Sequence, residues 1–73
     1  MILLDEIKVK TFEDGHPKTA IISATSDTKE EVGPGMTIVD LPDGCIPLLG
    51  SSIMTVGGDI TFVDSSGNWD NWQ

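Results

Sequence analysis

The stretch SSIMTVGGDITFVDSSGNWDNW, residues 51–72, decides the fold because it predicts two consecutive β-hairpins. In the first hairpin, Gly57 and Gly58 separate two runs rich in β-branched residues, 53–56 and 59–63. Two adjacent glycines supply the positive φ angles that a two-residue primed turn requires. The sequence therefore predicts a tight turn centred on this glycine pair.

The length of this turn sets which side chains share a face of the sheet. With a two-residue loop, Met54 lies opposite Thr61 on the following strand. Side chains alternate between the two faces along a strand. One face is then expected to hold Ile53, Ile60 and Phe62, and the other Met54, Val56, Val63 and Trp69.

A second turn follows at DSSG, residues 64–67. Asp at the first position and Gly at the fourth are typical of a type I turn, and this glycine can form the bulge that closes a hairpin. We therefore predict a three-stranded β-meander at the end of the chain. The oxygen-rich loop from Asp64 to Asp70 lacks the acid spacing and final Glu of an EF-hand. Turn chemistry explains it without calcium, but the sequence leaves calcium binding open.

Both faces of this meander are largely apolar, whereas a small sheet needs only one apolar face to fold. A 73-residue chain buries only about 60% of its unfolded surface, so little of it remains to cover a second face. Two interpretations stay open: the second face docks on a partner, or the N-terminal strands cover it and close a barrel. The first interpretation predicts a partner interface made of Met54, Val56, Val63, Trp69 and Trp72.

The rest of the chain adds short strands and turns. Residues 2–25 predict a hairpin with EDGHP as its turn, and SDTKEEVGPG, residues 26–35, predicts an exposed loop. Residues 36–72 supply further strands and the meander, with Pro47 restricting CIPLL to a sheet edge. We expect a single all-β domain, residues 1–73, built as a small antiparallel sandwich or partly open barrel of roughly five to seven short strands.

The charge of the chain restricts its partners. There are 12 acidic residues, 4 lysines and no arginine, which gives a net charge of −8. Binding to a nucleic-acid backbone requires cations that displace counterions, so we expect no nucleic-acid partner. An anionic membrane surface is disfavoured for the same reason. A basic protein surface fits better, as does a role in which charge repulsion keeps the protein in solution.

The sequence shows no constellation of catalytic residues. His16 lies alone in a turn, and the single cysteine, Cys45, lies in apolar CIPLL, which is typical of a small buried side chain. One His and one Cys cannot supply the ligands of a zinc site, and no phosphate-binding glycine motif is present. We expect no enzyme activity, no cofactor and no metal. No signal peptide or membrane-spanning run is recognised, which predicts a cytosolic, reducing origin.

Residues 42–69 carry a recognisable order of turns and strands: PDG, then GD opening a strand with an aromatic residue, then DSSG and a tryptophan. The positions concerned are Pro42, Asp43, Gly44, Gly58, Asp59, Phe62, Asp64, Gly67 and Trp69. In this order the chain resembles small head-associated proteins of tailed bacteriophages, although those proteins place the aromatic one residue earlier. The resemblance covers a little over a third of the chain. It implies a virion component of decoration or head-fibre type, assembled in the host cytoplasm.

Two functions from different classes follow. The first is a non-enzymatic structural protein of a phage virion that docks on the capsid shell, with the major capsid protein as partner and many copies or a homo-oligomer on the shell. The alternative is a small acidic inhibitor that mimics nucleic acid and binds a basic DNA-handling protein. The affinity of a mimic would fall steeply with salt, whereas apolar docking resists salt. The acids here are spread among turns and strand ends rather than gathered in a stripe.

Overall fold

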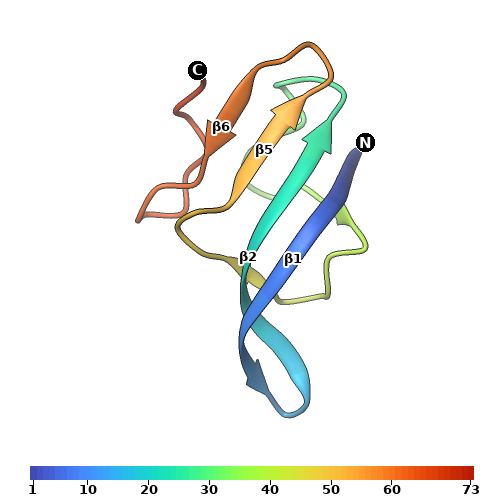
Figure 1. Ribbon diagram of the computed structural model, residues 1–73, viewed down its shortest axis with the longest axis vertical. Helices are drawn as coiled ribbons and strands as arrows, with labels where there is room; N and C mark the ends of the chain where they lie inside the picture. Colours follow the sequence, from blue (N-terminus) through green and yellow to red (C-terminus); the bar gives the residue numbers. More distant parts are fainter.

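The computed structural model describes residues 1–73 and confirms that the chain is all-β. Six strands form one mixed sheet that does not close into a barrel (Figure 1). The strands are β1 (Ile2–Glu13), β2 (His16–Ser26), β3 (Ile38–Val39), β4 (Ile46–Pro47), β5 (Ser52–Thr55) and β6 (Ile60–Phe62). Their order in the sheet is β3-β1-β2-β5-β6, and β4 pairs with β2 off this path. No helix that could span a membrane is present.

The two longest strands, β1 and β2, form an antiparallel hairpin whose tip is Asp14-Gly15. Both tip residues have positive φ, 52° and 80°, as a primed two-residue turn requires. In β1 the inward-facing apolar residues are Ile2, Leu4, Ile7 and Val9, so the two-residue period slips once. A bulge at Asp5 absorbs this slip, because an extra residue in one strand restores the inward direction of the side chains after it.

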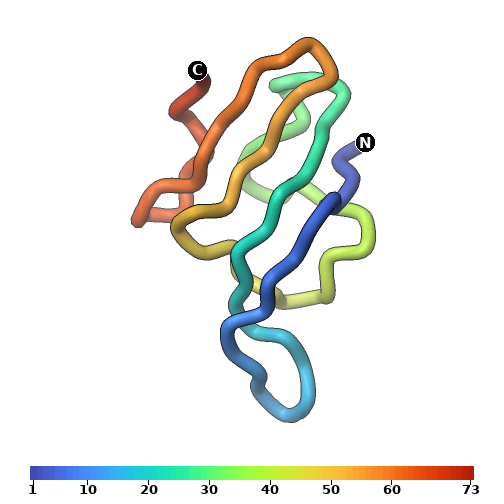
Figure 2. Tube along the Cα trace, in the orientation of Figure 1, coloured from blue at the N-terminus to red at the C-terminus, as the bar shows by residue number.

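The prediction of a purely antiparallel sheet is wrong. β2 pairs with β5 and β4 in parallel, and β1 pairs with β3 in parallel. The reason is the long connection from β2 to β5, residues 27–51, which is long enough to cross from one edge of the hairpin to the other. Its first part, residues 27–45, passes behind the sheet in Figure 2 and then adds β3 at the free edge of β1, and we call this segment the strap. The turn residues of the strap bend it within this crossing rather than joining antiparallel neighbours.

One interruption separates β4 from β5 along the same edge of β2. Between the two strands, the hydroxyl of Ser51 accepts a hydrogen bond from the Ile22 N–H at 3.0 Å, in place of a backbone partner. Just before it, the Leu48 N–H donates to the Ala20 carbonyl at 2.8 Å. The fully buried Ser51 therefore keeps the edge of β2 satisfied across the gap.

The predicted register of the β5–β6 hairpin is also wrong. Ile53 lies opposite Thr61 and Met54 opposite Ile60, because the loop has three residues, 56–58, instead of two. Only Gly58 of the glycine pair has a positive φ, 99°. The side chain of Thr55 stabilises the longer loop, since its hydroxyl accepts a hydrogen bond from the Asp59 N–H at 3.1 Å. The extra loop residue changes which residues share a face with Ile53.

The last strand of the predicted meander is replaced by an irregular tail. After the DSSG turn, the Asp64 N–H donates to the Asn68 carbonyl at 2.9 Å, and the chain then leaves β6. It returns only at its end, where Ile60 and Gln73 exchange backbone hydrogen bonds of 3.3 and 2.8 Å. Between these points the hydroxyl of Thr61 donates to the Trp69 carbonyl at 2.8 Å. These bonds hold the tail along β6 without a continuous ladder.

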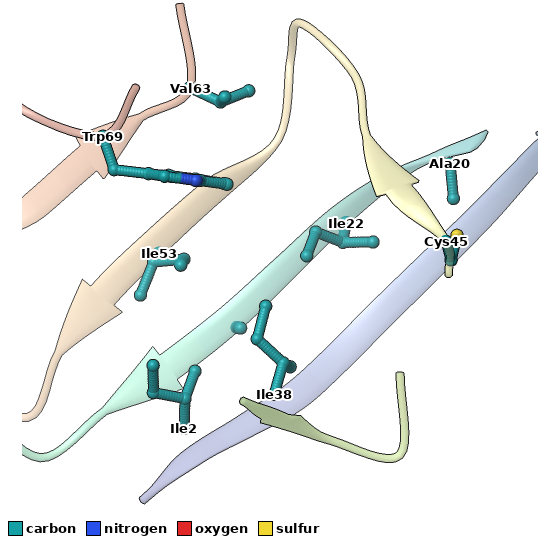
Figure 3. Packing of buried hydrophobic residues seen from close by; sticks show 9 residues of the cluster. Ile2, Ala20, Ile22, Ile38, Cys45, Ile53, Val63 and Trp69 are labelled. Atoms are coloured by element: carbon teal, nitrogen blue, oxygen red, sulfur yellow. The ribbon is translucent and has the colours of Figure 1, made fainter. Parts of the chain in front are cut away.

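The hydrophobic core lies between the sheet and the strap. Its buried members are Ile2, Ala20, Ile22, Ala24, Ile38, Cys45, Ile53, Val63 and Trp69. Figure 3 shows the indole of Trp69 beside Val63 and Ile53, so the tail closes one end of this core. From the strap, Val32, Met36 and Leu41 pack against the same cluster. Only one face of the sheet is therefore covered by the chain itself.

Candidate functional site

The candidate site is the face of the sheet that points away from the strap. The pairings align one residue from each of five strands across this face. We call this set the outer row: Val39, Leu3, Thr25, Met54 and Ile60. Leu3 is 47% exposed and Met54 46%. All members but the central Thr25 are apolar, and three of these apolar side chains are exposed to solvent: Val39, Leu3 and Met54.

A second line of pairs runs beside the outer row. It joins Glu6, Ser23, Ser52 and Phe62, and the Phe62 side chain is 41% exposed. A shallow hollow of about 240 Å³ lies next to this line, and Ile21 and Gly50 are among the residues that line it. The face therefore combines a row of mostly apolar side chains with a small recess and a polar margin.

The adjacent inner row shows the contrast. Leu4, Ala24, Ile53 and Thr61 align across the same strands, one position away from the outer row. Ile53 and Thr61 are fully buried. The buried hydroxyls of this face are hydrogen bonded, and no buried side-chain polar atom lacks a partner. The inner face is therefore part of a packed core in which the buried polar atoms are paired, whereas no element of the chain covers the outer row.

The structure divides the five residues predicted for a partner interface. Met54 and Val56 lie on the exposed side, and Val56 at the hairpin loop is 73% exposed. Val63 and Trp69 lie in the core, so they are not brought together with the first two. Trp72 is half-buried, and the Lys29 ammonium lies 5.6 Å from the centroid of its ring. Sequence reasoning missed Leu3, Val39 and Phe62, because the register of their strands was not known.

The tail and the strap are linked by charge near Trp72. The Lys29 Nζ lies 3.7 Å from Oδ1 of Asp59, the residue before β6, and lies over the Trp72 ring. A cation over an indole face contributes about 0.5–1 kcal/mol at exposed sites. Trp72 thus has a structural contact at the start of the strap.

Carboxylates in the same part of the strap bind the N-terminal amino group. The ammonium of Met1 donates to Glu31 and to Asp27, the latter at 2.9 Å. These bonds, first that to Glu31, raise the pKa of the amino group above 8.0. The same ammonium lowers the pKa of the Glu31 carboxyl below 4.5. Glu31 also accepts hydrogen bonds from the Asp27 and Thr28 N–H groups, so it closes the first turn of the strap.

The remaining chemistry-bearing residues do not form a cluster. No group of three or more His, Cys, Asp or Glu side chains is placed to hold a metal ion. Asp64 uses its Oδ1 to accept hydrogen bonds from the Ser66 and Asn68 N–H groups at 2.8 and 2.9 Å, which is an Asx turn. Burial raises the pKa of the Cys45 thiol, which disfavours its reactive thiolate form. His16 is exposed at the hairpin tip.

No family model, curated protein or solved structure matches this chain. Its function is therefore inferred from the residues and their arrangement.

Proposed function

We propose that this chain is a non-enzymatic structural protein of a phage virion, which docks in many copies on the capsid shell as a decoration or head-associated component. The observation that carries the proposal is the outer row, together with Phe62. Fully burying a side chain such as Leu, Met or Phe contributes about 1.5–3 kcal/mol. Three exposed side chains of this kind lie on one open face, Leu3, Met54 and Phe62. Covering these side chains with a partner would add a favourable free energy of burial that is absent in the free protein.

The major capsid protein is the partner that this proposal names. An open sheet face is suited to a broad protein surface, and weak contacts become strong when many copies bind one particle. The net charge of −8 favours solubility of the free protein before it docks. Residues Val63 and Trp69 then act from the core, by holding β5 and β6 in the geometry that displays Met54 and Phe62.

Incorporation into particles tests the proposal. We would produce the chain together with the other virion proteins, purify particles and measure the amount of this chain in them by mass spectrometry. The variant Met54→Ser/Phe62→Ser should fold but be lost from particles. The control Leu49→Ser also replaces an exposed apolar side chain by serine, but Leu49 is 62% exposed outside the outer row, and this variant should be incorporated normally.

Two results would overturn the proposal. One is equal incorporation of the wild type and the outer-face variant. The other is binding that disappears when the salt concentration is raised, because apolar docking is insensitive to screening whereas the phosphate-mimic alternative is not.

A further inference from the structure

A projecting arm, residues 10–18, forms one end of the molecule. Strand β4 pairs with Thr19 and Ala20, so residues 12–18 pair only with each other. Figures 1 and 2 show the arm extending away from the body at the end opposite both termini. The arm is a hairpin closed by a tight turn, with a 2.8 Å hydrogen bond between the Thr11 and Thr19 hydroxyls near its base. It is therefore an ordered projection without a covering surface of its own.

An aromatic side chain is displayed near the tip of the arm. Phe12 lies opposite Pro17 and is 67% exposed, compared with 41% for Phe62. Phe12 does not belong to the buried hydrophobic cluster of the core or to the side chains packed against it. Aromatic residues are enriched at protein–protein interfaces, where they supply large contact area.

The arm carries no net charge, whereas the body carries the whole net charge of the chain. Residues 10–18 contain two lysines and two carboxylates, and the rest of the chain has two lysines and ten carboxylates, a net charge of −8. Lys18 pairs with Glu13 at 3.8 Å. Lys10 has no salt-bridge partner. The arm thus presents an aromatic ring and one unpaired ammonium group.

The body offers a matching recess on its strap side. An open cleft of about 340 Å³ lies between the strap and the tail segment 67–70. Met36, Leu41 and Trp69 contribute apolar lining, and Asp70 lies at the cleft. An adjoining hollow shares Met36 and Leu41 and adds Asp43. Neither carboxylate has a salt-bridge partner.

We propose that the arm of one copy of this chain docks in the cleft of a second copy. The Phe12 ring packs on Met36, Leu41 and Trp69, where thioether and indole groups both favour an aromatic neighbour. The ammonium of Lys10 approaches the carboxylate of Asp70. The proposal concerns contacts between copies and goes beyond the proposed function, since it does not involve the outer row.

A second copy is favoured over other occupants by charge and size. The cleft is acidic at its margin, and two of the four lysines of this chain, Lys10 and Lys18, lie on its own arm. The volume lies at the lower end of the range of about 300–1,000 Å³ found for small-molecule pockets, which suits a few side chains from a hairpin. Arm and cleft are different surfaces, so the contact is heterologous. Each copy then engages two neighbours, and the assembly is a ring or an open chain.

Complementation between two variants tests this geometry. The arm variant is Phe12→Ala/Lys10→Ala, and the cleft variant is Asp43→Lys/Asp70→Lys. Sedimentation velocity at high protein concentration and low salt should show wild-type oligomers, with association of either variant alone weakened about tenfold or more. A mixture of the two variants should give dimers that grow no further, because one intact arm and one intact cleft remain.

Matched variants separate this contact from a general effect of charge and from a loss of folding. Glu30→Lys changes charge on the strap, away from the cleft, and should associate more strongly than the cleft variant. Combining Lys10→Glu with Asp70→Lys in one chain should restore association, which a loss of folding would not allow. The proposal is overturned if the wild type stays monomeric, if the mixture forms no dimers, or if Phe62→Ala weakens association as much as Phe12→Ala. Failure here leaves particle incorporation through the outer face intact.

Discussion

The two faces of the same sheet differ less in composition than in what covers them. On the inner face, Leu4 and Ile53 lie under the strap and the tail. On the outer face, Leu3 and Met54 occupy the neighbouring positions of the same strands and lie open to solvent. Both faces carry large apolar side chains. The difference teaches that the course of one connecting segment, residues 27–45, decides which apolar face is the core.

This difference also explains why the outer face is a candidate site. The hydrophobic effect is proportional to apolar area and does not distinguish one face from the other. The strap packs against the inner face, and the tail, which runs along β6, adds the Trp69 side chain to the same core. The outer face is left uncovered by the chain.

The largest expected effect compares two neighbouring residues of β5. Ile53→Ala should lower the free energy of unfolding by about 2–5 kcal/mol, because it leaves a cavity in the core. Met54→Ala should change it by less than about 1 kcal/mol, since surface substitutions rarely have larger effects. Urea unfolding followed by tryptophan fluorescence measures both. An equal decrease in the free energy of unfolding for the two variants would contradict the assignment of Ile53 to the buried face and Met54 to the exposed face.

The next effect compares two threonines. Thr61→Val removes the buried hydroxyl that donates to the Trp69 carbonyl, and should reduce stability by about 1–3 kcal/mol because the carbonyl loses its partner. Thr25→Val removes a bond to the Asp5 carboxylate on the outer face, at 2.6 Å and exposed to solvent. Its effect should be smaller. The same unfolding curves decide this, and a larger loss for Thr25→Val would contradict the assignment of the faces.

A smaller effect tests the register that places Met54 outside. Gly58 has a φ of 99°, so Gly58→Ala should cost about 1–2 kcal/mol. Gly57 does not have a positive φ, and an added Cβ would meet only the Thr55 hydroxyl at 3.7 Å, so Gly57→Ala should be close to neutral. Thermal unfolding of the two variants measures the difference. Similar losses at both glycines would indicate the two-residue turn instead.

The smallest effect concerns the anchoring of the strap and depends on pH. Glu31 has a lowered pKa when folded, so its contribution is complete above pH 4.5 and is lost as the pH falls toward the folded value. The Met1 amino group has a raised pKa, so its contribution is complete below pH 8.0 and is lost as the pH rises through the folded value. The stability gap between wild type and Glu31→Gln should be widest between these limits. Glu30→Gln removes an exposed carboxylate without a salt-bridge partner and is the matched control for the loss of one negative charge from the strap.

The sequence predicted the all-β class and the strand-forming character of residues 53–56 and 59–63. It did not predict the parallel pairing of β2 with β5, because nothing local distinguishes a strap that crosses the sheet from a loop that turns back. It also missed the register, since Gly57-Gly58 fits a two-residue loop and the longer loop depends on the Thr55 hydroxyl. The outer row spans five strands and becomes visible only when their pairing is known.

Oxidation of the methionines in the dilute, monomeric protein tests the central claim most directly. Met54 lies on the outer face and is 46% exposed, whereas Met36 is half-buried against the core. Peroxide treatment followed by peptide mass spectrometry compares two side chains of identical chemistry, and access determines their rates. The outer face being uncovered, Met54 should be oxidised well before Met36. A Met54 side chain as protected as Met36 in the monomer would contradict the account.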